Sequence, residues 1–308
     1  MIVEHFGLKA NPFHSLPNTA GYYPATSQER ALECVHRGLS RQESILLLTG
    51  ETGLGKSLLC HCLLRRSTSS SAYLTNSHLS DRVALYQSIL YDLGISHSEE
   101  REQPLRLLLT DHLLSTWAQS GATLLVVDEA HLLSDDLLEE LRLLSNLESE
   151  HGRAIQILLV GQSVLESRLE SPSLASLQQR LAVRASLSPM PLDESMDYLN
   201  HRIRFSGGKP EKVMEAEALE LIAKAGRGVA RVLNQLAYHS CEMACEIKAP
   251  VVDVEIVMET LTAHRIAVQS DPEAPWGSVI RIEESEAESQ SKEKATPLPQ
   301  KIVAPRPA

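Results

Sequence analysis

The feature that most limits what this chain can fold into is the segment Gly50-Glu51-Thr52-Gly53-Leu54-Gly55-Lys56-Ser57. It matches G-x-x-x-x-G-K-[ST], a loop that binds phosphate between a strand and a helix. Its glycines allow backbone N–H groups to converge on phosphate oxygens, while Lys56 suits the β- and γ-phosphates and Ser57 suits Mg²⁺. An apolar run at 44–49 precedes the loop, and a helix-like run at 57–64 follows it. We therefore expect all eight residues to bind a nucleotide.

A second apolar run, at 123–127, ends in Asp128 and Glu129. Such a run is typical of a buried parallel strand, and ligands bind at the carboxyl ends of these strands. We expect Asp128 to hold Mg²⁺, directly or through a water, and Glu129 to polarise the water that attacks the γ-phosphate. The alternative is an ordinary strand followed by an acidic helix cap.

Three more polar residues are candidates for the same chemistry. Gln162 follows a third strand-like run, at 154–161, and is expected to sense the γ-phosphate or orient the water; the alternative is a helix cap. Arg180, with Arg184 in reserve, is the candidate to neutralise charge at a neighbouring subunit's nucleotide. Arg231 begins a long predicted helix and is expected to reach back to the γ-phosphate. The alternative for each arginine is an ordinary surface ion pair.

Composition limits the class of protein. The chain has 308 residues, 43% hydrophobic and 22% charged, as in soluble globular proteins, and its net charge is −11. This charge argues against broad nonspecific nucleic-acid binding, although a local basic patch inside a ring is compatible with it. No apolar run approaches the roughly 18–20 residues that span a bilayer, and the N-terminus lacks a secretory signal. With five cysteines, we expect a cytoplasmic protein that reaches the inner membrane only through a partner.

The pattern along the chain predicts four parts. Residues 1–30 form an irregular N-terminal segment, with Ser27 as a plausible cap of the following helix. Strand–helix alternation over 31–190 predicts an α/β domain, a parallel sheet with helices on both faces, including helices at 81–93, 105–119 and 131–147. Residues 191–266 read as a small helical lid domain. Residues 267–308 are acidic and rich in Pro, typical of disorder, either a solvated tail or a docking tether.

These motifs together resemble a known family. The flanks that carry the resemblance are Phe6-Gly7-Leu8, Pro12-Phe13, Leu48-Thr49-Gly50-Glu51, Val127-Asp128-Glu129-Ala130-His131, Leu159-Val160-Gly161-Gln162, Gln179-Arg180 and Gly228-Val229-Ala230-Arg231-Val232-Leu233-Asn234. Over about residues 1–265 the chain resembles the ExeA or general-secretion-pathway protein A branch of the AAA+ ATPases, a class of P-loop NTPases.

The resemblance implies an AAA+ core with a helical lid, ATP and Mg²⁺ as ligands, and nucleotide-linked homo-oligomers. It implies the family's site roles for Lys56, Ser57, Asp128, Glu129, Gln162 and Arg231. Secretion members of the family often continue into a membrane span and a peptidoglycan-binding domain, and this chain is expected to be a short form without either. Shorter relatives occur beside exopolysaccharide or protein-sorting systems, and the fold is similar to that of DNA-transposition ATPases.

Three functions remain open at this point. The favoured one is an ATPase that energises or regulates assembly of a secretion or envelope system, together with a protein partner. The second is a transposition-type regulatory ATPase that binds nucleic acid. The third is a nucleotide-dependent scaffold with negligible hydrolysis, against which the presence of Glu129 argues.

Overall fold

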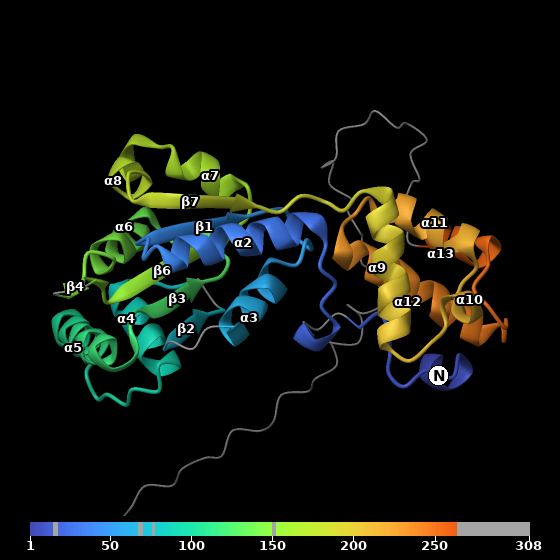
Figure 1. The fold of residues 1–308 in the computed structure, drawn as a ribbon, viewed down its shortest axis with the longest axis horizontal. Helices are drawn as coiled ribbons and strands as arrows, with labels where there is room; N and C mark the ends of the chain where they lie inside the picture. Colours follow the sequence, from blue (N-terminus) through green and yellow to red (C-terminus); the bar gives the residue numbers. More distant parts are fainter. Residues whose placement is uncertain (15–17, 67–69, 76–77, 150–151, 264–308) are drawn as a thin grey trace, which may run out of the picture.

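A computed structural model describes residues 1–14, 18–66, 70–75, 78–149 and 152–263. It has two lobes, one built on a sheet and one entirely helical, and an extended segment leads from the last strand of the sheet to the helical lobe (Figure 1). The main sheet has five parallel strands in the order β2-β3-β6-β1-β7. Its strands are β1 (Ile45–Thr49), β2 (Ser71–Leu74), β3 (Thr123–Val127), β6 (Ile155–Gly161) and β7 (Leu181–Ser186).

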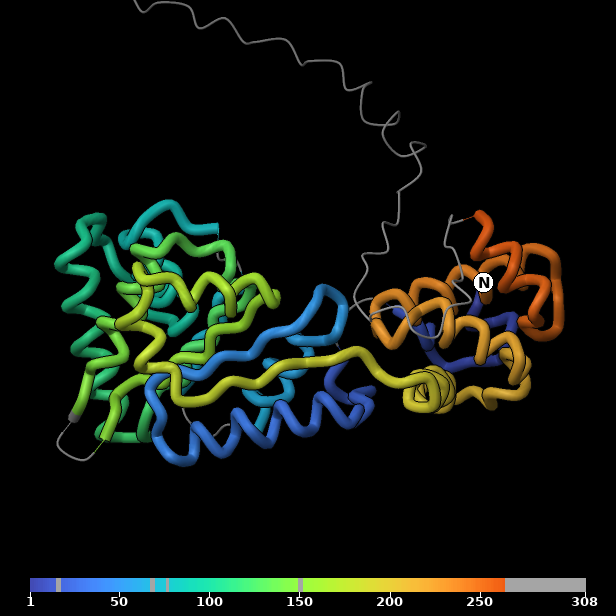
Figure 2. The backbone as a smooth tube through the Cα atoms, turned by 90° about the horizontal axis from the view of Figure 1, so that it is seen from above, coloured from blue at the N-terminus to red at the C-terminus, as the bar shows by residue number. Residues whose placement is uncertain are grey.

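Alternating side chains of the central strands enter two separate cores. In β1, Ile45 and Leu47 pack on one face of the sheet, whereas Leu46 and Leu48 pack on the other. Both faces must therefore be covered, which is why β1, β3 and β6 are apolar almost throughout. The first face is covered by α4 (Arg82–Asp92), α5 (Glu102–Ser120), α6 (Asp135–Leu144), α7 (Val164–Leu169) and α8 (Ala175–Gln178). The second face is covered by α2 (Thr26–Ser40) and α3 (Lys56–Arg66), and Figure 2 shows α2 running along the sheet.

The helical lobe has a core of its own. It consists of α9 (Leu192–Phe205), α10 (Pro210–Val213), α11 (Ala216–Gly226), α12 (Ala230–Glu246) and α13 (Val254–Ala263). Apolar residues at helical spacing, such as Leu199, Ile222 and Leu233, are fully buried between these helices. Each such side chain contributes about 1.5–3 kcal/mol by leaving water, so the lobe is stabilised independently of the sheet.

The N-terminal segment packs on the helical lobe and not on the sheet that follows it in sequence. Ile2, in the short helix α1 (Ile2–His5), and Phe13 are buried in the helical core. The Lys9 N–H donates to the Ser206 carbonyl at 2.8 Å. The N-terminus accordingly lies beside the helical lobe in Figure 1. The first residues of the chain thus complete a lobe whose helices begin almost 180 residues later.

The fold class predicted from the sequence is confirmed, with local corrections. The strand β7 was not predicted, and a short hairpin, β4 (Glu148–Ser149) with β5 (Gly152–Arg153), stands where a loop was expected. The helix expected at 131–147 is a 3₁₀ turn, η2 (Ala130–Leu132), followed by α6. Ser27 does not cap α2, because the helix begins at Thr26, after Ala25. The predicted tail, at 267–308, lies outside the described residues. Among the residues that the structure describes, no helix is long and apolar enough to cross a membrane.

Candidate nucleotide-binding site

Three loops meet at the carboxyl edge of the sheet. The phosphate-loop segment follows β1, Asp128 and Glu129 follow β3, and Gln162 follows β6. Since β6 lies between β3 and β1, these three loops are neighbours in space. The register places Thr49 beside Gly161, so β1 and β6 end at the same level. The sheet therefore gathers residues that are far apart in sequence, at the edge where open α/β sheets bind ligands.

The loop 50–57 is compact, and its lysine is buried. Lys56 is the first residue of α3 and is only 6% exposed. Its Nζ donates to the carbonyl oxygens of Gly50 at 2.8 Å and Glu51 at 3.1 Å. Burial lowers the pKa of Lys56, whereas the nearby carboxylates oppose that shift, Glu129 more strongly than Asp128. The ammonium is thus held inside the loop, close to the helix N-terminus where phosphate is favoured.

Ser57 and Asp128 are in direct contact. The Ser57 hydroxyl donates to Oδ2 of Asp128 at 2.6 Å, and Asp128 is 4% exposed. Oδ1 of Asp128 accepts the backbone N–H of Glu129 at 2.9 Å. A hydroxyl and a carboxylate oxygen at one point are hard oxygen ligands of the kind that Mg²⁺ prefers. The residues present therefore fit a magnesium ion at this end of the loop.

Glu129 has a specific backbone conformation and a specific neighbour. Its φ of 53° and ψ of 35° lie in the left-handed region, which is uncommon for a residue other than glycine. Its carboxylate is 41% exposed, and Oε2 lies 3.5 Å from Nδ1 of His131. That separation suits an electrostatic contact but not an aligned hydrogen bond, and Nδ1 accordingly has no hydrogen-bond partner. Unlike the buried Asp128, Glu129 lines the cavity that lies over the phosphate loop and is described below.

The segment after β6 is attached to the phosphate loop. The Ser163 hydroxyl donates to Oε1 of Glu51 at 2.7 Å, and the Thr49 hydroxyl donates to Oε1 of Glu166 at 2.6 Å. Gln162 lies at the start of this segment, between the ends of β1 and β3, where a sensing side chain is expected. Its predicted role remains a prediction, because its side chain does not line the cavity described next.

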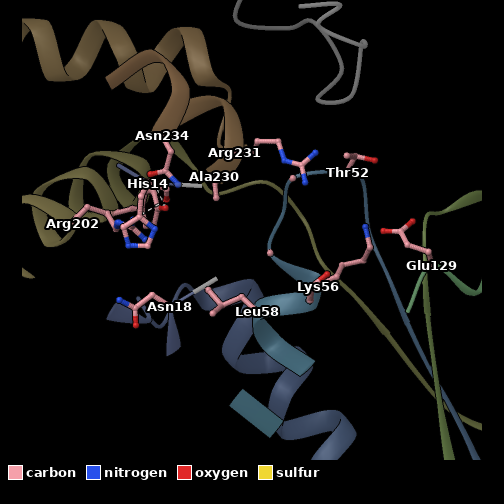
Figure 3. Close-up of a pocket in the computed structure, with 14 residues that line it drawn as sticks. His14, Asn18, Thr52, Lys56, Leu58, Glu129, Arg202, Ala230, Arg231 and Asn234 are labelled. Atoms are coloured by element: carbon pink, nitrogen blue, oxygen red, sulfur yellow. Dashed lines mark hydrogen bonds between the residues drawn. The ribbon is translucent and has the colours of Figure 1, made fainter. Parts of the chain in front are cut away.

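A cavity of about 230 Å³ lies over the loop, between the two lobes. From the sheet lobe it is lined by Thr52, Gly53, Gly55, Lys56, Ser57, Leu58 and Glu129. The N-terminal segment contributes His14 and Asn18, and the helical lobe contributes Tyr198, Arg202, Ala230, Arg231 and Asn234. Figure 3 shows Lys56 and Glu129 at one end of this cavity and His14 with Arg202 at the other. The remaining loop residues, Gly50, Glu51 and Leu54, do not line the cavity.

Arg231 brings the helical lobe onto the phosphate loop. Its backbone N–H, in the first turn of α12, donates to the Gly53 carbonyl at 3.1 Å. Gly53 has a φ of +88°, and a Cβ added there would lie 2.9 Å from Cβ of Arg231. A glycine is therefore needed both for the backbone conformation and for the close approach of α12. The Arg231 side chain lines the cavity, as its predicted role requires.

Arg180 lies at the amino ends of the strands, on the side of the sheet opposite to the phosphate loop. It immediately precedes β7, whose first residue, Leu181, pairs with Ile45 at the start of β1. Five residue steps along β7 separate this point from Ser186, beside the end of β1, which is roughly 16 Å. Arg180 thus cannot reach the nucleotide site of its own chain. Arg184 is exposed on the same edge strand.

Sequence reasoning missed several residues at this site. Tyr73, on β2, donates its hydroxyl to Oδ2 of Asp128 at 2.7 Å. His14, Tyr198 and Arg202 line the cavity from the N-terminal segment and α9. The only sequence signal for Tyr73 is its place in a short strand, because its partner depends on strand order. His14 and Arg202 carry no local motif at all.

Comparison with known proteins defines the class. A family model described as an AAA domain matches residues 39–169. The fold is similar to that of the ORC2 protein of Aeropyrum pernix, with a TM-score of 0.63 and 18% identity over 82% of this chain and 71% of that one. It is also similar to Cdc6p of Pyrobaculum aerophilum, with a TM-score of 0.65 and 19% identity over 80% and 71% of the two chains. A third similar structure is a RuvB mutant of Thermotoga maritima, with a TM-score of 0.56 and 20% identity over 82% of this chain and 74% of that one. These likenesses show the fold alone, which is that of a P-loop protein of the AAA type, in agreement with the AAA domain matched at residues 39–169.

A curated relative is more specific. General secretion pathway protein A of Aeromonas hydrophila is 31% identical over 237 residues, which are 76% of this chain and 43% of that protein. Residues 39–169 therefore match an AAA domain, and the chain is a relative of general secretion pathway protein A, as its motifs predicted. It spans less than half the length of that relative.

Proposed function

We propose that this chain binds ATP with Mg²⁺ and hydrolyses it to ADP and phosphate. The observation that carries the proposal is the 2.6 Å contact between Ser57 and Asp128, whose sequence neighbours are the phosphate-loop Lys56 and the exposed Glu129. Hydrolysis needs a positive clamp on the phosphates, a metal site and a base for water, all within one small volume. The AAA fold supports this reading but leaves the reaction to be tested.

Each residue has a defined role in this proposal. Lys56 would neutralise phosphate charge, and Ser57 with Asp128 would hold Mg²⁺. When bound, Mg²⁺ would supply positive charge against the phosphate oxygens. Glu129 would accept a proton from the attacking water, a role that suits its exposed carboxylate. Gln162 would help to orient that water.

The base of the nucleotide would enter the part of the cavity furthest from Glu129. This end is lined by His14, Asn18, Tyr198 and Asn234, which combine apolar surface with hydrogen-bonding groups, as ligand pockets do. Arg231 would contact the phosphates from the helical lobe, so that residues 191–266 act as a lid. Arg180, at the far edge of the sheet, would serve a neighbouring subunit in a homo-oligomer.

The biological role that we propose is to energise or regulate the assembly of a secretion or envelope system through a protein partner, from the cytoplasmic side of the inner membrane. Its support is the relationship to general secretion pathway protein A. Because this chain spans only part of that relative, the role is inferred from the shared region alone.

The test is steady-state ATP hydrolysis by the wild type and by Lys56→Ala. Loss of the charge-assisted bonds to phosphate, each about 1.5–3 kcal/mol, should weaken ATP binding by about 100-fold and abolish turnover. Lys224→Ala is the matched control, because the Lys224 side chain is exposed and pairs with Glu220 on the surface of α11, in the other lobe. Equal ATP affinity in wild type and Lys56→Ala would refute the assignment.

Glu129→Gln separates binding from chemistry. We expect normal ATP binding, a turnover lower by about 10²–10⁴-fold, and oligomers trapped with ATP. Unchanged turnover would remove Glu129 from the role of base. The same assays with duplex DNA distinguish the biological roles, since strong stimulation by DNA would favour a transposition-type ATPase over the secretion role.

A further inference from the structure

Tyr73 is the residue at this site that the proposed chemistry leaves unexplained. It lies on β2, the edge strand next to β3, and it pairs in register with Val126. Its neighbours Ala72 and Leu74 point into the core on one face of the sheet, so Tyr73 points to the other face, beneath α3. Its ring meets the imidazole of His61 edge-on, with centroids 4.9 Å apart. The tyrosine is thus wedged between α3 and the end of β3.

The hydroxyl of Tyr73 reaches the same oxygen as the hydroxyl of Ser57. Oδ2 of Asp128 accepts from Ser57 at 2.6 Å and from Tyr73 at 2.7 Å, while Oδ1 accepts the Glu129 N–H. One oxygen of Asp128 therefore accepts donors from two different elements, α3 and β2.

We propose that Tyr73 is a positioning residue that fixes the Asp128 carboxylate for Mg²⁺. The inference rests on the proposed function and deepens it. Two donors on one oxygen, one from α3 and one from β2, hold the plane of the carboxylate between two rigid elements. Partners that orient a metal-binding carboxylate typically change metal affinity by 10–100-fold when they are removed.

The experiment uses Tyr73→Phe in the full chain, which removes the hydroxyl and keeps the packed ring. Binding of a fluorescent, non-hydrolysable ATP analogue is measured while Mg²⁺ is titrated, and again with the metal chelated. We expect the Mg²⁺ concentration for half-maximal binding to rise by about tenfold. Binding without metal should stay at the wild-type level, which a general loss of structure would not allow.

Tyr22→Phe is the matched control. Tyr22 also donates its hydroxyl to a carboxylate, Glu29 at 2.8 Å, but Glu29 has no part in the proposed metal site. A Mg²⁺ response of Tyr73→Phe equal to that of Tyr22→Phe would overturn the inference and leave the proposed function intact. A wild-type chain whose analogue binding is independent of Mg²⁺ would overturn both.

Discussion

Arg202 provides the most direct test of how the N-terminal segment is held. Its guanidinium is buried, with the residue 7% exposed, and Nε donates to the Pro12 carbonyl at 2.7 Å. A second nitrogen, Nη2, donates to the His14 carbonyl at 3.3 Å. Hydrogen bonds from a charged donor contribute about 1.5–3 kcal/mol each, and the longer bond belongs at the low end. Arg202→Met, which keeps an apolar side chain in place, should therefore cost about 3 kcal/mol of unfolding free energy.

The measurement is urea denaturation followed by circular dichroism at 222 nm. With a slope of about 3 kcal/mol per molar urea for a chain of this size, the midpoint should fall by roughly 1 M. Arg204→Met is the control, since Arg204 lies on the same helix but is exposed and should change stability by less than about 0.5 kcal/mol. If the two variants shift the midpoint equally, Arg202 does not anchor the N-terminal segment, and the reasoning fails.

Two further predictions concern the joints between elements. Gly228 has a φ of +74°, and a Cβ there would lie 2.0 Å from the Met190 carbonyl oxygen, whereas Gly94 has a φ of +72° and open space around it. Gly228→Ala should therefore cost about 3 kcal/mol more than Gly94→Ala, measured by the same urea titrations, and equal costs would show that only backbone strain matters. The second prediction concerns Asp135, whose half-exposed carboxylate accepts a hydrogen bond from Arg168, and this bond lowers the pKa of Asp135. The ion pair therefore stabilises the fold at any pH above the pKa of Asp135 in the unfolded chain, and this stabilisation is lost as the pH falls through the lower pKa of the folded chain. Asp135→Asn should cost at most about 1 kcal/mol at pH 7, and the difference from wild type should disappear in acid; a difference that persists at low pH would exclude the ion pair as its source.

The sequence predicted those parts of the site that depend on local order. The loop 50–57 and the Asp128-Glu129 pair each stand directly after an apolar run, and a buried parallel strand places whatever follows it at the ligand-binding edge. The strand β7 escaped prediction because it is an edge strand with alternating burial and contains Ala182 and Arg184, residues without a strong strand preference. Without that strand, the position of Arg180 at the amino ends of the strands, away from the phosphate loop, could not be predicted.

Other parts could not be predicted, because they depend on contacts over long sequence separations. The bond from Arg202 to Pro12 joins residues 190 positions apart, and Arg202 belongs to no motif. Tyr73 meets Asp128 only because β2 and β3 are neighbours, a fact of strand order that the pattern of residues within β2 does not contain. Hydrophobic periodicity identifies helices and strands, but it does not specify which other element the polar end of a side chain will contact.

The segment 228–231 shows how such contacts acquire a function. On one side, the Gly228 carbonyl accepts the N–H of Met190, in the segment that connects the two lobes, at 3.1 Å. On the other side, the Arg231 N–H donates to Gly53 in the phosphate loop. The start of α12 is therefore bonded both to the connection and to the loop. A change in the loop backbone at Gly53 must either break the bond to Arg231 or move α12, and a movement of α12 must act on the connection at Met190. The two lobes thus meet through backbone bonds at the phosphate loop, and in the proposed function these bonds would link binding of a nucleotide in the loop to the position of the helical lobe.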